Sequence, residues 1–120
     1  MSQTVQNIMT RLAGEALALG RRVKLSSGTF VYSDADEKAI GVTVISAAIG
    51  APVAVEIAGG KTQKVCASAA ITKDASIYAR ADGKVDDAGA GSDSAVIGVC
   101  LETALADGDL VECILNAVVA

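Results

Sequence analysis

The chain has 120 residues, a formal net charge of −4 and no histidine, and 52% of its residues are hydrophobic. This length is enough for a single domain with one buried core. The acidic balance argues against nucleic acid as a partner, because phosphate contacts need clustered lysine and arginine. The lack of histidine removes the commonest general base and metal ligand, so we expect neither an enzyme nor a bound metal or cofactor.

The first 16 residues differ in pattern from the rest. Their apolar residues recur at spacings of three and four, as on one face of a helix; they are Val5, Ile8, Met9, Leu12 and Ala16. A helix this short is marginal in water on its own, so an extended arm that becomes ordered against a partner is the other interpretation. In either case residues 1–16 are predicted to form an N-terminal arm whose apolar side needs a covering surface.

After residue 16 the pattern is one of short strands and turns. Val53, Val55 and Ile57 alternate with Ala54 and Glu56, which is typical of a half-buried strand. In chain order, the expected strands are 23–25, 29–32, 40–45, 53–57, 76–79, 84–85, 95–101 and 110–115. Short strands at this spacing predict an all-β domain over residues 17–120, built as a small barrel or a sandwich.

The two halves of this β region match each other. Ile40-Gly41-Val42 corresponds to Ile97-Gly98-Val99, and Val53-x-Val55-x-Ile57 corresponds to Val111-x-Cys113-x-Leu115. The turn glycines Gly28 and Gly83 correspond as well, and Asp82-Gly83 is a strong hairpin signal in which both residues take positive φ. We therefore expect two pseudo-repeated β units, over about 17–57 and 71–115.

The three cysteines, Cys66, Cys100 and Cys113, lie in apolar, strand-like stretches without metal-binding spacing. Buried, reduced thiols are the expectation, and a Cys100–Cys113 disulfide is the alternative if their strands are neighbours. The chain lacks a signal-peptide pattern at its start and has no apolar run long enough to cross a bilayer. We expect a soluble protein without a membrane partner.

Two features of the loops leave other functions open. Acidic residues cluster over 34–37, 82–93 and 107–109; they could bind a cation, but none has the spacing of a calcium loop, and Asp and Gly are ordinary turn residues. Lys84, at a predicted hairpin turn, could be the modified lysine of a carrier domain, but it lacks the flanking residues of such domains. The alternative function is a non-catalytic ligand- or receptor-binding β-module, with or without a stabilising cation.

Fragments from both halves, in order and spacing, resemble the capsid decoration (head cement) proteins of tailed phages. The fragments are Ala13–Leu17, Gly20–Leu25, Ala39–Val42, Gly50–Val55, Ala70–Thr72, Asp82–Val85, Val96–Val99 and Asp107–Val111. Asp74 departs from the pattern, because the family tends to place a turn glycine there, which puts the geometry of one turn in doubt.

The resemblance implies a structural virion protein with no catalytic residues. Such a protein is made in the bacterial cytoplasm, binds the outer surface of the capsid, commonly as a trimer, and bridges subunits of the major capsid protein. We expect the apolar residues Val5, Ile8, Met9 and Leu12 to form one capsid contact. Arg21 and Arg22 either pair with acidic capsid groups or guard a solvated strand edge.

Overall fold

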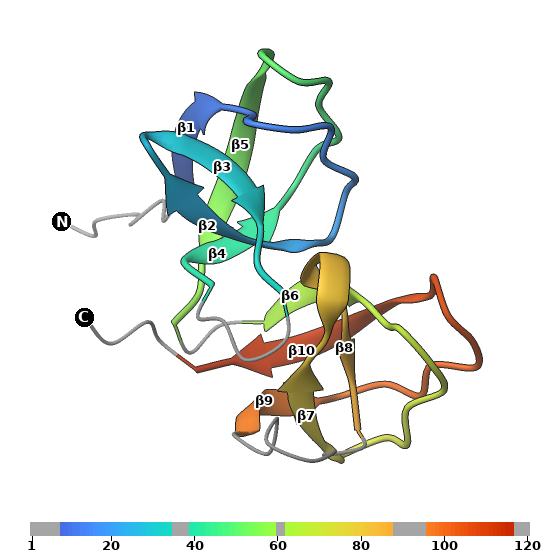
Figure 1. Ribbon diagram of the computed structural model, residues 1–120. Coiled ribbons are helices and arrows are strands. Elements are labelled where there is room, and N and C mark those ends of the chain that lie inside the picture. Colours follow the sequence, from blue (N-terminus) through green and yellow to red (C-terminus); the bar gives the residue numbers. More distant parts are fainter. Residues whose placement is uncertain (1–7, 35–38, 60–61, 88–95, 117–120) are drawn as a thin grey trace, which may run out of the picture.

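The computed structural model describes residues 8–34, 39–59, 62–87 and 96–116. These residues form ten strands and one 3-10 turn, in two antiparallel five-stranded sheets (Figure 1). The elements are β1 (Ile8–Leu12), β2 (Arg22–Ser26), β3 (Thr29–Tyr32), β4 (Gly41–Thr43), β5 (Pro52–Ile57), β6 (Thr62–Cys66), β7 (Ser76–Ala79), η1 (Ala81–Gly83), β8 (Val85–Asp86), β9 (Val96–Cys100) and β10 (Leu110–Leu115). None of the described residues belongs to a helix long and apolar enough to span a bilayer.

The second sheet repeats the first strand for strand. The order is β1-β5-β4-β2-β3 in the first sheet and β6-β10-β9-β7-β8 in the second, which is the same path with each number raised by five. Bonds outside the ladders repeat too: Leu17 N–H donates to Ala47 O, and Ile71 N–H donates to Ala104 O. The all-β class and the duplication are confirmed. We call β1–β5 the first unit and β6–β10 the second unit; they also include β1 and β6, which precede residues 17 and 71.

Neither sheet closes into a barrel within the described residues. Isolated parallel bridges, Ala13–Phe30 and Ala67–Val85, bring the first and third strand of each unit close together, but no ladder joins them. Of the two predicted architectures, the barrel is therefore wrong, and the arrangement is a sandwich-like pair of sheets.

Each unit has an apolar core. The core of the first unit consists of Ala13, Leu17, Val23, Phe30, Val53 and Val55. The core of the second unit also takes in Val42 and Ala58 from the first unit. Because one core contains side chains from both units, the units are packed against each other.

Residues 8–12 belong to the segment for which a helix and an extended arm were both open. They are extended in β1 and pair along their whole length with β5. The period-two alternation of a strand sends Met9 to the core of the first unit and leaves Ile8 and Leu12 on the opposite face. Residues 1–7 lie outside the described residues.

Asp74 departs from the family pattern, in which a turn glycine is usual, but the chain still makes the expected turn there. Its φ is +68°, close to the +78° of Gly20 at the equivalent place in the first unit. The hydrogen bonds also correspond, because Asp74 N–H donates to Cys100 O as Gly20 N–H donates to Thr43 O. Aspartate is one of the few residues besides glycine that visits the left-handed region routinely.

We expect Asp74→Gly to be neutral or to stabilise the chain by up to about 1 kcal/mol, because relief of the left-handed strain is partly offset by the freer unfolded chain. Asp74→Ala keeps a Cβ and loses the local tolerance of aspartate, so it should destabilise the chain by about 1 kcal/mol. Urea unfolding of the two variants checks the order; an alanine variant more stable than the glycine variant would contradict this account.

Candidate functional site

The first candidate surface lies on the side of the first sheet that faces away from its own core. Ile8 and Leu12 project from this side of β1 and are 49% and 52% exposed. The ladder places Pro52 of β5 opposite Leu12, and Val44 N–H donates to Ala54 O just beyond the end of β4. We call the surface formed by Ile8, Leu12, Val44, Pro52 and Ala54 the outer face. It combines an apolar surface with the sheet edge at β1.

A groove of about 350 Å³ continues this surface toward the second unit. Its lining residues are Leu19, Val42, Thr43, Val44, Glu56, Thr62, Gln63, Lys64, Leu110 and Glu112. Glu56 connects the groove with the outer face, because it is the ladder partner of Ile8. Leu19 and Leu110 are each about two-fifths exposed, so the groove adds apolar area from both units to the same side of the molecule.

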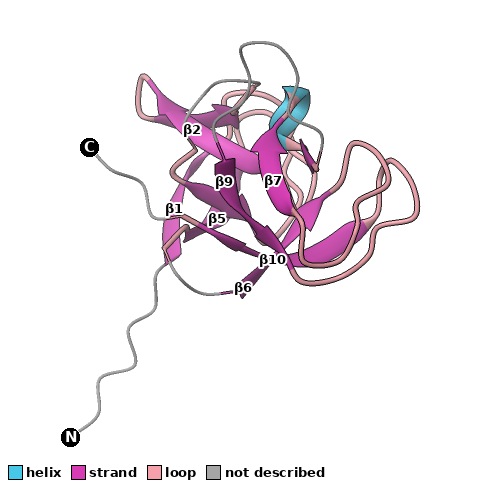
Figure 2. Cartoon of the chain, turned by 90° about the horizontal axis from the view of Figure 1, so that it is seen from below, coloured by secondary structure: helices cyan, strands magenta, loops and turns pink. Residues whose placement is uncertain are grey.

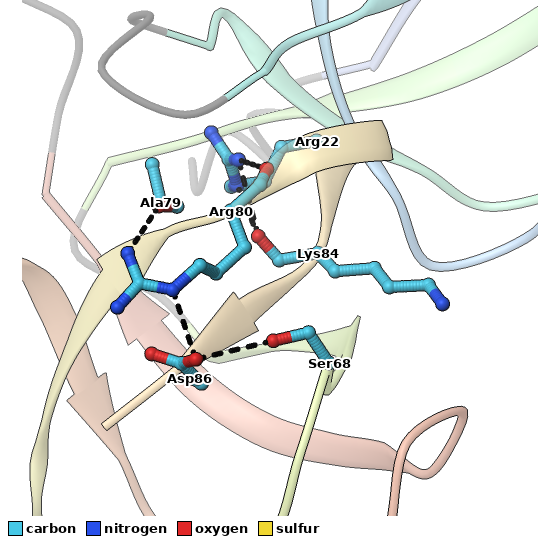
Figure 3. Close-up of polar contacts among 6 residues, drawn as sticks. All are labelled: Arg22, Ser68, Ala79, Arg80, Lys84 and Asp86. Carbon is cyan, nitrogen blue, oxygen red and sulfur yellow. Dashed lines mark hydrogen bonds and ion pairs between the residues drawn. The ribbon is translucent and has the colours of Figure 1, made fainter. Parts of the chain in front are cut away.

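The predicted arginine pair lies elsewhere, at the contact between the two units. Arg22 is 1% exposed, and its guanidinium donates to the carbonyl oxygens of Arg80 at 2.8 Å, Lys84 at 3.1 Å and Ser33 at 3.2 Å. Two of these oxygens belong to the β7–β8 hairpin of the second unit, as Figure 3 shows for Arg80 and Lys84. Arg22 therefore ties the first unit to this hairpin from a buried position.

Arg21 contacts the same hairpin from a partly exposed position. One of its terminal N–H groups donates to Asp82 O at 3.1 Å, and its guanidinium carbon lies 5.4 Å from the centre of the Tyr32 ring. Its Nε is buried and has no hydrogen-bond partner among the described residues. Arg22 thus makes a buried contact between the two units, and Arg21 makes a half-buried one.

We call the contact that Arg21 and Arg22 make with the β7–β8 hairpin, together with the backbone hydrogen bonds beside it, the junction between the two units. Gly83 N–H donates to Ser33 O at 2.9 Å, and Cys66 N–H donates to Gly20 O at 2.7 Å. The helical turn η1, cyan in Figure 2, presents the β7–β8 hairpin to the first unit.

A largely buried ion pair within the second unit holds the hairpin in place. Arg80 Nε lies 2.9 Å from Asp86 Oδ2, and both side chains are less than one-fifth exposed. Ser68 Oγ donates to the same carboxylate oxygen at 3.3 Å (Figure 3). Because a buried charge is costly without partners, this network fixes the backbone carbonyl that Arg80 offers to Arg22. Sequence reasoning missed Ser33, Ser68, Arg80 and Asp86, since no motif marks these residues as partners of one another or of Arg22.

The acidic loops use their carboxylates within the fold. Asp34 accepts a bond from Asp82 N–H at 3.0 Å, Asp109 accepts from Leu105 N–H at 2.8 Å, and Asp107 accepts from Lys84 Nζ at 2.8 Å. The Lys84 ammonium holds the pKa of Asp107 below its usual value. Across the described ranges, no three carboxylates or thiols are grouped so as to hold a metal ion; residues 35–37 and 88–93 of the clusters lie outside those ranges.

The predicted contact residues therefore fall in different places. Ile8 and Leu12 share the outer face, Met9 packs on the core of the first unit, and the two arginines lie at the junction. Val5 lies outside the described residues.

The fold has a counterpart among solved structures. The head fiber gp8.5 N base in bacteriophage phi29 superposes with a TM-score of 0.75 at 18% sequence identity, over 94% of this chain and 98% of that chain. At this identity the likeness shows a common fold. No curated protein gives a significant match.

A family model described as "phage cement protein" matches residues 3–115. The match begins before β1 and runs to the last residue of β10, so it includes both units, the outer face and the junction. By this match over nearly its whole length, the chain belongs to the phage cement protein family.

Proposed function

We propose that this chain is a non-catalytic structural protein of the virion. It binds the outer surface of a phage head after synthesis in the host cytoplasm, as a trimer, and bridges neighbouring subunits of the major capsid protein so that the shell is stabilised. Membership of the phage cement protein family supports an association with the capsid; the outer surface, the bridging and the trimer are the proposal.

The observation that carries the proposal is the outer face. Half of the Ile8 side chain and half of the Leu12 side chain are exposed on an edge strand, where a partner can cover them without any opening of the fold. Burying these exposed halves would contribute roughly 1 kcal/mol for each side chain. In a trimer the same face occurs three times, so modest contacts add up to a firm attachment through multivalency.

The proposal assigns the first capsid contact to the apolar side of residues 5–12, of which Ile8 and Leu12 lie on the outer face. Arg21 is partly exposed, so it is the arginine that the proposal assigns to an acidic capsid group. Arg22 is buried in the junction, and the proposal gives it the task of keeping the two units in fixed relative positions.

The double variant Ile8→Thr/Leu12→Thr tests the contact. Threonine keeps a good strand propensity but removes most of the apolar area, so we expect roughly 2 kcal/mol weaker binding per copy, about a thirtyfold loss of affinity. The measurement is co-sedimentation with heads that lack this protein, with bound copies counted by gel densitometry at several protein concentrations.

The matched control is Leu25→Thr. Leu25 is 41% exposed on β2 and lies outside the outer face, so this variant should decorate heads like the unmodified chain. Equal binding by the double variant and the control would refute the assigned contact. Cryo-electron microscopy of decorated heads tests the rest: we expect threefold density on the outside that touches more than one capsid subunit, and density confined to a single subunit would contradict bridging.

A further inference from the structure

Three buried thiols take part neither in the outer face nor in the side-chain contacts of the junction. Cys66, Cys100 and Cys113 are all free and lie on β6, β9 and β10. Cys100 and Cys113 are direct partners in the antiparallel β9–β10 ladder, whereas Cys66 is opposite Leu110. The first two cysteines therefore form a pair, and the third stands apart from it.

The Cys100–Cys113 pair is of the non-hydrogen-bonded kind. The ladder bond runs between the flanking residues, from Leu101 N–H to Glu112 O at 2.8 Å, while Cys100 N–H donates to Ala75 O on the other side of β9 at 3.0 Å. In such pairs the Cα atoms are about 4.5 Å apart and the side chains lie close together. A disulfide spans Cα separations of roughly 4.4–6.8 Å, so this register is compatible with a bond between the two sulfur atoms.

The surroundings of the pair favour a sequential reaction. Both side chains are fully buried in the core of the second unit, which excludes bulky reagents. Cys100 Sγ donates to Glu102 O at 2.9 Å. Burial and the neighbouring Cys100 raise the pKa of the Cys113 thiol, which disfavours its reactive thiolate, and we assign the first reaction step to Cys100.

We propose that Cys100 and Cys113 are an oxidative modification site that a small peroxide converts into a cross-strand disulfide. In the first step the Cys100 sulfur gives up its proton and attacks one oxygen of hydrogen peroxide. The O–O bond breaks, the released hydroxide takes up a proton to become water, and Cys100 becomes a sulfenic acid.

In the second step the Cys113 sulfur attacks the Cys100 sulfur. The S–S bond forms, the S–O bond breaks, and the hydroxyl group leaves as water with the Cys113 proton. Two thiols and one peroxide thus give one disulfide and two waters. The bond would join β9 to β10, which are neighbours inside the second sheet. The two cysteines would stay reduced in a reducing cytoplasm and form the disulfide in oxidising surroundings.

The variant Cys66→Ala tests this proposal, because it leaves only the two thiols of interest. The folded variant is freed of reductant and exposed to hydrogen peroxide. We expect a mass lower by two hydrogen atoms, a peptide map that links Cys100 to Cys113, and a higher urea midpoint than that of the reduced form. The double variant Cys66→Ala/Cys113→Ala should instead gain oxygen on Cys100, and its peptide map should contain no linked peptides.

Several results would overturn the proposal. One is oxygen gain without a cross-link in Cys66→Ala, and another is a disulfide that forms only between molecules. A third is an unchanged mass in the folded variant when the urea-unfolded variant is oxidised by the same treatment. A lower urea midpoint for the cross-linked form would show that the geometry does not fit. The experiment needs no capsid, so its outcome is independent of the proposed capsid binding.

Discussion

Arg22→Met is expected to destabilise the folded chain by about 3–5 kcal/mol, because three buried carbonyl oxygens lose a charged hydrogen-bond donor. The guanidinium donates to the carbonyl oxygens of Ser33, Arg80 and Lys84 from a position that is 1% exposed. Methionine fills much of the volume but has no N–H donors, so these oxygens would lose partners in a site closed to water. The loss should fall on the junction, because two of the three acceptors belong to the second unit.

Urea unfolding followed by circular dichroism measures this cost. The matched control is Arg11→Met, since Arg11 is exposed on β1 and surface substitutions usually change stability by less than about 0.5 kcal/mol. Arg22→Lys should fall between the two, because an ammonium cannot reproduce the planar set of donors. An Arg22→Met variant that unfolds within about 1 kcal/mol of the unmodified chain would show that the junction does not depend on this side chain.

Much of the fold could be predicted because local patterns and tertiary structure agree. The predicted strand 53–57 lies within β5, which extends it by one residue at Pro52. The Asp82-Gly83 turn has the two positive φ values, +59° and +72°, that its sequence predicts. The duplication was visible in the sequence because both units require glycine at the same position. A Cβ on Gly41 or Gly98 would overlap a carbonyl oxygen of the neighbouring strand.

The N-terminal segment was ambiguous for a physical reason. Ile8, Met9 and Leu12 fit a helical spacing, but they fit a strand equally well once Met9 faces the core and the other two face outward. An edge strand that is apolar on both sides has no clean alternation, so periodicity alone cannot separate the two structures. Only the long-range pairing with β5 decides, and no local signal reports that pairing.

The role of Arg22 was beyond the sequence for another reason. Its acceptors include main-chain oxygens up to 62 residues away, and a backbone carbonyl leaves no mark in the amino-acid sequence. The charge of Arg22 suggested a surface position, as is usual for arginine. The β7–β8 hairpin stabilises the buried guanidinium, because it brings two backbone carbonyl oxygens within hydrogen-bond distance of it (Figure 3).

Gly83→Ala should cost about 3–4 kcal/mol, against about 1 kcal/mol for Gly28→Ala. The two glycines occupy equivalent hairpin turns of the two units, with φ of +72° and +81°, so left-handed strain is common to both variants. They differ in surroundings: a Cβ on Gly28 has nothing within 4 Å, whereas a Cβ on Gly83 would lie 2.5 Å from Arg22 O and 2.8 Å from Arg22 N.

The difference in the free energy of unfolding between Gly83→Ala and Gly28→Ala therefore measures the effect of the close packing at the junction. To relieve the overlap, the hairpin must move away from β2, which stretches the Gly83–Ser33 bond and the bonds from Arg22 to Lys84 O. Urea unfolding of both variants gives the difference, and equal costs would mean that the hairpin shifts freely. In the double variant with Arg22→Met, the combined loss should be smaller than the sum of the single losses, because both changes open the same contact.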